Sequence, residues 1–223
     1  MRRTSPAEFV LAHTRVRRAP FVPEVTLHLA DDSLELWEAT QVAVERGDIP
    51  PPFWAFVWAG GQALARHVLD HDIVAGRDVV DIATGSGLVA VAAALSGAES
   101  VTAYDVDPMA VAATRANARL NNVTVDVREA DVRDVVVRAG TLVTVGDVFY
   151  DERIAAAMLP ALSAFVAAGA EVLVGDPHRA YLPDTRLDPL ATYDVDVETD
   201  IEDAPVKTTV VARFLRTTPQ AVS

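Results

Sequence analysis

Cysteine, long apolar runs and basic residues are each absent or scarce in this chain of 223 residues. The lack of cysteine excludes disulfides, thiolate metal sites and a cysteine nucleophile. No apolar run approaches the roughly 20 residues that a membrane-spanning helix needs, although hydrophobic residues make up 51% of the sequence. Residues 1–6 lack the apolar core of a secretory signal. We therefore expect a cytoplasmic protein that does not associate with membranes.

Basic residues are outnumbered by acidic ones, with 19 Lys and Arg against 32 Asp and Glu and a net charge of −13. Binding to nucleic-acid phosphates needs a basic face, so we expect no nucleic-acid partner. An acidic surface can steer a cationic partner such as an exposed lysine, but solubility explains the same charge equally well. The charge therefore excludes partners more than it identifies one.

A strand, a glycine turn and a helix follow one another at the centre of the chain. Residues 79–82 read as a buried parallel strand, residues 84–87 as a tight turn, and residues 88–95 as a buried helix. Residues 100–105 then read as a second strand that ends in Asp105. Such an arrangement holds a nucleoside, with its ribose hydroxyls on the carboxylate.

Two cofactor classes use this arrangement, and the residues of the turn separate them. Dinucleotide sites favour a third glycine after the first two, but here Ala90 follows Gly85 and Gly87. Asp81 would repel a pyrophosphate, whereas it suits the cationic methionine end of S-adenosylmethionine. A turn without any ligand would leave Asp81 nearly buried and without a partner, which is costly. We therefore favour S-adenosylmethionine over NAD or FAD.

The first fifty residues are expected to form a helical appendage to a main domain over residues 51–223. Ser5, Pro6 and Glu8 match a capping box, which predicts a helix that runs to about Arg17. The appendage should continue with an extended stretch over residues 21–30 and a second helix from Asp32 or Ser33 to Glu45, ended by Gly47.

The pattern of the remaining chain predicts an α/β fold, a single Rossmann-like doubly wound sheet of seven strands whose last pair is antiparallel. Five βα units and a final hairpin account for the seven strands. The expected helices cover residues 62–69, 88–95, 108–120 and 151–168, and the expected strands cover residues 79–82, 100–105, 123–127, 141–145, 171–177, 191–198 and 206–215.

An aromatic segment, residues 53–58, follows the three prolines at residues 50–52 and precedes the first expected helix of the main domain. It can be a hydrophobic plug between the appendage and the sheet, or an aromatic wall over a cofactor or cationic substrate. We expect Trp58 near the ligand and Trp54 in packing. His67 and His71 have the spacing of a helical metal pair, but no third ligand is near in sequence, so we expect no metal site.

Three further residues follow strand ends, where ligands of doubly wound sheets bind. Asp131 comes just past the third expected strand and can accept the adenine amino group, or it can be a loop acid or helix cap. Asp147 and Tyr150 follow the fourth strand, where the transferred group would lie.

Four segments together resemble the seven-β-strand S-adenosylmethionine-dependent methyltransferases, and more narrowly the lysine methyltransferases that modify the β subunit of electron transfer flavoprotein. The segments are residues 52–66 with the aromatic block, Asp105-Val106-Asp107-Pro108, residues 145–152 with Gly-Asp-Val-Phe-Tyr-Asp-Glu, and Gly175-Asp176-Pro177. The resemblance extends from about Phe21 to Phe214, and it includes bacterial chains, so we expect a bacterial source.

The resemblance implies that Asp81, Gly85, Asp105 and Trp58 contact the cofactor, with Gly87 completing the turn. It also implies that Asp147 and Tyr150 line a lysine channel, in which Asp147 orients the amine and Tyr150 closes the channel. Ala83 departs from the glycine of the generic motif, and its methyl group narrows the approach to the methionine moiety.

The implied activity is transfer of a methyl group from S-adenosylmethionine to a protein lysine, with the flavoprotein β subunit as the expected partner. A small amine or another protein, such as a ribosomal protein, is the alternative acceptor, because those enzymes share every cofactor residue. A non-catalytic cofactor-binding module is a third interpretation, which the acids Asp81, Asp105 and Asp147 disfavour.

Overall fold

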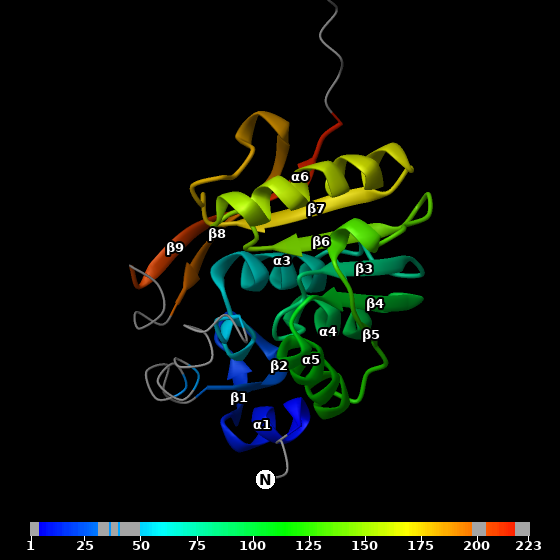
Figure 1. The fold of residues 1–223 in the computed structure, drawn as a ribbon. Helices are drawn as coiled ribbons and strands as arrows, with labels where there is room; N and C mark the ends of the chain where they lie inside the picture. The colour runs from blue at the N-terminus through cyan, green and yellow to red at the C-terminus, as the bar shows by residue number, and fades with distance from the viewer. Residues whose placement is uncertain (1–4, 31–35, 37–39, 41–49, 198–203, 217–223) are drawn as a thin grey trace, which may run out of the picture.

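The computed structural model describes residues 5–30, 36, 40, 50–197 and 204–216, and it contains the predicted seven-stranded sheet. The strands lie in the order β5-β4-β3-β6-β7-β9-β8 (Figure 1). Neighbours from β5 to β7 pair in parallel, whereas β9 pairs antiparallel with both β7 and β8. The predicted fold class is therefore confirmed, including its antiparallel last pair.

Four helices cover the two faces of the sheet. The strands are β3 (Asp78–Ile82), β4 (Ser100–Asp105), β5 (Asp126–Glu129), β6 (Leu142–Gly146), β7 (Glu171–Asp176), β8 (Leu187–Asp196) and β9 (Val206–Phe214), and the helices are α3 (Ala59–Asp70), α4 (Leu88–Leu95), α5 (Pro108–Leu120) and α6 (Glu152–Ala167). Buried side chains of α3, α4 and α5 share one cluster with one sheet face, and those of α6 share another with the opposite face.

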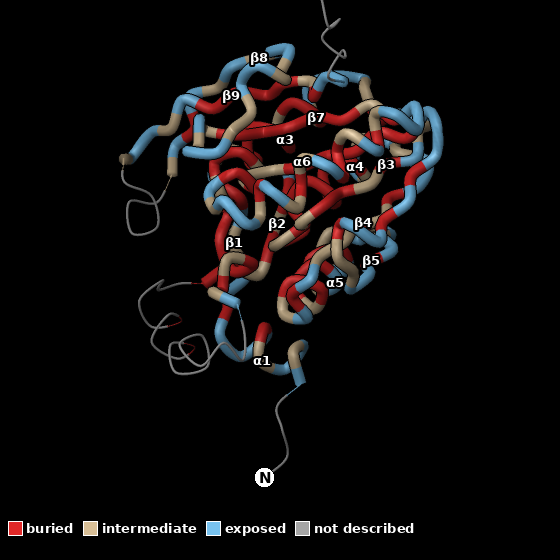
Figure 2. Tube along the Cα trace, turned by 45° about the horizontal axis from the view of Figure 1, so that its top comes forward, coloured by how far each residue is buried: buried red, intermediate tan, exposed pale blue. Residues whose placement is uncertain are grey.

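Burial follows this layered order. The central strands are almost wholly buried, because parallel strands between two helical layers have no face toward water (Figure 2). The edge strand β8 is mostly exposed along its length. Within the described ranges, no helix combines the length and apolarity needed to span a membrane.

The N-terminal segment differs from the prediction, because it contains a hairpin as well as a helix. The capping box is present, but α1 (Pro6–Ala12) ends five residues before Arg17. The arginine-rich residues instead form β1 (Arg15–Ala19), which pairs antiparallel with β2 (Val22–Leu29). The extended stretch predicted over residues 21–30 contains β2, but an isolated strand leaves its backbone groups unpaired, and β1 supplies the partner. The second predicted helix lies outside the described residues except at Leu36 and Thr40.

Other differences concern the bounds of elements and the number of complete βα units. The helix predicted over residues 62–69 begins at Ala59, and the strand predicted over residues 123–127 is paired only over Asp126–Glu129. The later start follows from register, because the parallel pairing sets Asp126 opposite Thr102 and Glu129 opposite Asp105. The sequence predicted five βα units but placed no helix after the third and fifth strands. The described chain has short 3₁₀ turns there, so three βα units are complete.

Candidate active site

A cavity of about 590 Å³ lies beyond the carboxyl ends of the parallel strands. This is the edge at which open α/β sheets bind ligands. The predicted site residues that line it are Trp58, Asp81, Ala83, Gly85, Asp105, Asp131, Asp147 and Tyr150. Gly87 is the one predicted residue that does not line the cavity.

The glycine turn has the predicted position and an unexpected backbone conformation at its start. Ala83, Gly85 and Gly87 have φ angles of 53°, 54° and 80°, all in the left-handed region that favours glycine. A Cβ on Gly87 would lie 2.7 Å from Thr114 Cγ2, so this glycine allows α5 to approach the turn. Gly87 therefore acts in packing, whereas the turn residues Ala83 to Ser86 border the cavity.

Asp81 is buried at the end of β3 and already accepts two hydroxyl hydrogen bonds. Thr84 Oγ1 donates to its Oδ2 at 2.6 Å, and Thr144 Oγ1 donates to its Oδ1 at 2.7 Å. Burial nevertheless raises the pKa of Asp81 to about 6, because desolvation outweighs the hydroxyl bonds. A cation beside this carboxylate would stabilise its charged form, which suits the ammonium group of a bound amino acid.

Asp105 is held at the end of β4 by two backbone N–H groups. Gly85 donates to its Oδ2 at 2.9 Å and Asp107 donates to its Oδ1 at 3.0 Å. Burial raises the pKa of Asp105. Asp107 caps α5 through Met109 N–H, and burial raises its pKa to about 6. Asp105 is thus oriented by the glycine turn itself, which links the two elements expected to hold a nucleoside.

Asp131 borders the cavity and also caps a 3₁₀ turn (Val132–Asp134). Its two oxygens accept hydrogen bonds from the backbone and guanidinium of Arg133. The Arg133 side chain lowers the pKa of Asp131 to about 2. The cap and the cavity position, offered as alternatives from the sequence, are thus both present.

These residues fit S-adenosylmethionine better than a dinucleotide. The cavity falls within the roughly 300–1,000 Å³ of small-molecule sites. Five aspartates border it, and three of them, Asp81, Asp105 and Asp131, offer carboxylates to which an ammonium, a ribose diol and an adenine amino group could donate. A pyrophosphate placed between Asp81 and Asp105 would instead face two acids.

Asp147 connects three elements at the opposite wall. Its Oδ2 accepts a hydrogen bond of 2.7 Å from Gly61 N–H at the start of α3. Its Oδ1 accepts from Nη2 and Nε of Arg179 at 2.9 and 3.2 Å, in an ion pair whose side chains are 9% and 17% exposed. The predicted catalytic acid is thus neutralised by a cation and caps a helix.

Aromatic rings complete this wall in a chain of edge-to-face contacts. The Phe53 ring lies 5.5 Å from that of Trp58 and 5.4 Å from that of Tyr150. The Arg179 guanidinium lies 5.6 Å from the Trp58 ring centroid, in cation–π geometry. Trp58 lines the cavity as predicted, and Trp54 is 2% exposed in a separate packing cluster, although it too borders the cavity.

Arg179 is the functional residue that sequence reasoning missed. No motif in the sequence singles it out, because its partners are set by the tertiary structure. The available signal was its place three residues after Asp176, at the end of β7. Arg179 N–H donates to Asp176 Oδ1 at 2.7 Å, so the loop folds back over the strand end.

Comparisons with known proteins point to one class of enzyme. A family model described as ribosomal protein L11 methyltransferase (PrmA) matches residues 62–173. The chain is 35% identical over 218 residues to the electron transfer flavoprotein β-subunit lysine methyltransferase of Xenopus laevis, covering 95% of this chain and 87% of that protein. It is 38% identical over 186 residues to the corresponding protein of Danio rerio, covering 80% and 70%.

A solved structure shares the fold. The magnesium protoporphyrin IX methyltransferase of Synechocystis PCC 6803, with bound S-adenosylhomocysteine, superposes with a TM-score of 0.55 at 14% identity, covering 84% of this chain and all of that one. At this identity the likeness shows the fold alone.

Proposed function

Because the chain belongs to the family of electron transfer flavoprotein β-subunit lysine methyltransferases, it is an S-adenosylmethionine-dependent methyltransferase, and we propose that it methylates a lysine of such a β subunit. The observation that carries the acceptor proposal is the extent of the likeness. It covers almost the whole chain, including the aromatic wall and the Asp147 segment, and not only the cofactor half of the fold.

The cofactor side of the proposal assigns one group to each acid. When bound, S-adenosylmethionine supplies a methyl group on a positively charged sulfur. We assign its ammonium group to Asp81, its ribose hydroxyls to Asp105 and its adenine amino group to Asp131. Trp58 and Ala83 border the methionine portion, and Gly85 lets the backbone come close to it.

The acceptor side is the wall of Asp147, Tyr150 and the aromatic rings. Methyl transfer is an in-line displacement, so the protein mainly aligns the amine and excludes water. The lysine must arrive neutral. The ion pair with Arg179 supports this, because a neutralised Asp147 does not trap an ammonium ion as strongly as a lone carboxylate would. Asp147 then orients the amine, and Tyr150 closes the channel with its ring and hydroxyl.

Tyr150 acts through its protonated hydroxyl. Burial raises its pKa to about 12, so the hydroxyl keeps its proton at neutral pH. Tyr150 is 41% exposed and lines the cavity, and its ring is in contact with that of Phe53. This position suits a residue that an entering side chain must pass.

A ribosomal protein is the second candidate acceptor, and the match of residues 62–173 to the ribosomal protein L11 methyltransferase model favours it. The two candidates share the cofactor residues and differ in what enters beside Trp58 and Tyr150. A small amine remains the third acceptor class.

Intact-mass spectrometry separates these acceptors. The β subunit and ribosomal protein L11 of the same organism are each incubated with the enzyme and S-adenosylmethionine, and a parallel reaction contains Asp105→Ala as the control. We expect the β subunit to gain methyl groups on lysine only with the wild-type enzyme. Methylation of L11 or of a small-molecule amine, with an unmodified β subunit, would overturn the acceptor assignment.

We also propose that the protein works in the cytoplasm of a bacterium without binding nucleic acid. The lack of cysteine and the net charge of −13 support the location and the absence of such a partner.

A further inference from the structure

Asn117 on α5 is a fully buried amide whose two ends bind different parts of the chain. Its side-chain oxygen accepts a hydrogen bond of 2.7 Å from the backbone N–H of His28 in β2. Its side-chain nitrogen donates to the backbone carbonyl of Ser86, also at 2.7 Å. One side chain thus connects the N-terminal hairpin to the glycine turn.

The turn is held by α5 at two consecutive carbonyls. Thr114 Oγ1 donates to Gly85 O at 3.1 Å, and Asn117 donates to the next carbonyl, that of Ser86. Gly85 and Ser86 both border the cavity, and Gly85 N–H orients Asp105. The position of the peptide between Gly85 and Ser86 therefore decides both the shape of the glycine turn and the direction of the Asp105 carboxylate.

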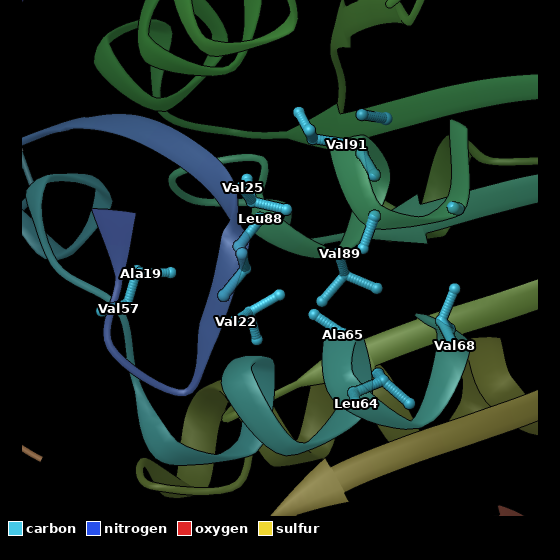
Figure 3. Close-up of a cluster of buried hydrophobic side chains, with 14 of the residues drawn as sticks. Ala19, Val22, Val25, Val57, Leu64, Ala65, Val68, Leu88, Val89 and Val91 are labelled. Atoms are coloured by element: carbon cyan, nitrogen blue, oxygen red, sulfur yellow. The ribbon is translucent and has the colours of Figure 1, made fainter. Parts of the chain in front are cut away.

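The hairpin is docked on α5 through backbone groups of β2. Asn121, one turn after Asn117, accepts from Thr26 N–H at 3.0 Å and donates to Thr26 O at 2.6 Å. Side-chain amides thereby satisfy backbone groups that an edge strand would otherwise leave open. Val22 and Val25 of β2 also share a buried cluster with Leu88 at the start of α4 (Figure 3).

From these contacts we propose that Asn117 is a positioning residue of the cofactor site and links S-adenosylmethionine binding to docking of the N-terminal hairpin. A buried amide that loses either partner leaves a polar group unsatisfied, so its two hydrogen bonds stabilise each other. A cofactor that orders the turn must then also stabilise the docked hairpin, because coupling between two sites is reciprocal. The inference concerns cofactor binding alone and holds whichever acceptor the enzyme methylates.

The first test needs no variant. Amide hydrogen exchange of the full wild-type chain is measured with and without saturating S-adenosylhomocysteine. We expect slower exchange both in the glycine turn with α4, residues 84–95, and in the hairpin, residues 15–29. Protection of the turn with an unchanged hairpin would overturn the linkage, whereas an unprotected turn would show that the cofactor binds elsewhere.

The second test compares Asn117→Asp with Asn121→Asp as the matched control. Each aspartate carboxylate still accepts from the hairpin N–H but cannot donate. Asn117→Asp therefore loses the hydrogen bond to Ser86 O, whereas Asn121→Asp loses the hydrogen bonds to Thr26 O and to the backbone carbonyl of Asn117 in its own helix. We expect Asn117→Asp to weaken S-adenosylhomocysteine binding by about tenfold, within the usual range of coupling, and to abolish the cofactor-dependent protection of the hairpin.

Asn121→Asp should speed exchange in the hairpin in the absence of cofactor without undocking it, because Asn117 still holds His28. The affinity and the cofactor-dependent protection should therefore stay in place. Calorimetric affinities are compared at a temperature where all variants are folded, and Asn117→Ala replaces the aspartate if that charge prevents folding. Wild-type affinity in the folded Asn117 variant, or equal losses in both variants, would overturn the proposal.

Discussion

Three residues at neighbouring strand ends have backbone conformations that L-amino acids rarely adopt. Ala83 after β3, Asp147 after β6 and His178 after β7 have φ angles of 53°, 54° and 60°. Each left-handed residue costs roughly 1–2 kcal/mol, and such strain concentrates at functional sites. At His178 the turned backbone is followed by Arg179, which reaches Asp147. At Asp147 and His178, the strained backbone therefore accompanies the ion pair between Asp147 and Arg179.

Replacing Ala83 by glycine should stabilise the protein. Glycine adopts a φ of 53° without the steric cost of a Cβ, so we expect about 1 kcal/mol of added stability. Urea unfolding measures it, with Ala156→Gly on the exposed face of α6 as the control. That change should cost about 1 kcal/mol, because glycine is a poor helix former. Destabilisation by Ala83→Gly would show that the methyl contacts outweigh the strain.

Asp147 should be needed for transfer and dispensable for cofactor binding. We expect Asp147→Ala to lower the rate of methyl transfer by about a hundredfold or more, because the amine loses its alignment. Asp147→Asn keeps an acceptor for Gly61 N–H and removes the ion pair with Arg179, so it isolates the role of the charge. Methylation kinetics and S-adenosylhomocysteine calorimetry provide the two readouts. A near wild-type rate in the alanine variant would remove Asp147 from its assigned role.

At the scale of elements, the start of α3 is pressed against the ends of β6 and β7. A Cβ on Gly60 would overlap the carbonyl oxygen of Gly175 and lie 2.6 Å from Asp147 Oδ2. A Cβ on Gly146 would lie 3.1 Å from Gly61 Cα. Backbone-to-backbone contact of this kind brings Gly61 N–H within reach of Asp147 and sets Trp58 on the cavity wall.

Adjacent glycines of α3 should therefore respond in opposite ways to alanine. Gly60→Ala should push α3 away from β7 and cost about 2 kcal/mol or more, the range of overpacked cores. Gly61→Ala has no Cβ contact closer than 4.0 Å, and it should stabilise the helix by about 0.5–1 kcal/mol. Thermal or urea unfolding compares the two. Equal destabilisation by both would contradict the close approach described for Gly60.

At the scale of the whole molecule, acidic groups are concentrated at one edge of the sheet. Asp176 is fully buried at the end of β7, and burial raises its pKa to about 7. Its Oδ2 accepts no hydrogen bond from the described residues. Burial likewise raises the pKa of Asp81 and Asp107 to about 6. The folded protein without cofactor therefore holds protons near neutral pH that the unfolded chain releases.

Stability should accordingly rise as the pH falls from about 8 to 5. The raised pKa of Asp176 lies above its ordinary value of 3.8, so the folded state binds the proton first as the pH falls. Asp131, whose pKa is lowered to about 2, opposes this trend only at more acidic pH. Burial lowers the pKa of His28 and His67 below the ordinary value of 6.5, so these two imidazoles oppose the trend below about pH 6.5 and reduce its size. We expect the melting temperature to increase by about 3 °C or more over this range.

Asp176→Asn should raise the melting temperature at pH 8 and reduce its pH dependence, because the buried carboxylate with the highest pKa is removed while Asp81 and Asp107 remain. Asp72→Asn, an exposed loop change of equal charge, should leave the pH dependence unchanged. A wild-type melting temperature that is constant or falls between pH 8 and 5 would contradict the assignment to buried carboxyls.

Local patterns predicted those elements whose signals lie within a few residues of each other. The helices Leu88–Leu95 and Pro108–Leu120 and the strand Ser100–Asp105 have the predicted bounds, because glycine, proline and apolar periodicity mark their ends. The sequence predicts helix for residues 15–17 of the hairpin strand Arg15–Ala19, because the stability of this strand comes from pairing with β2 and not from its own residues.

What the sequence by itself determined was the order of the strands and helices of the seven-stranded sheet along the chain, the cofactor class and which acids stand at strand ends, since these depend on neighbours along the chain. Only the tertiary structure decided that Arg179 neutralises Asp147, that Gly60 lies against Gly175 and that Asn117 connects His28 to Ser86. These contacts join residues far apart in the chain, and each depends on the packing of α3, α5 or a strand-end loop, which no local pattern specifies.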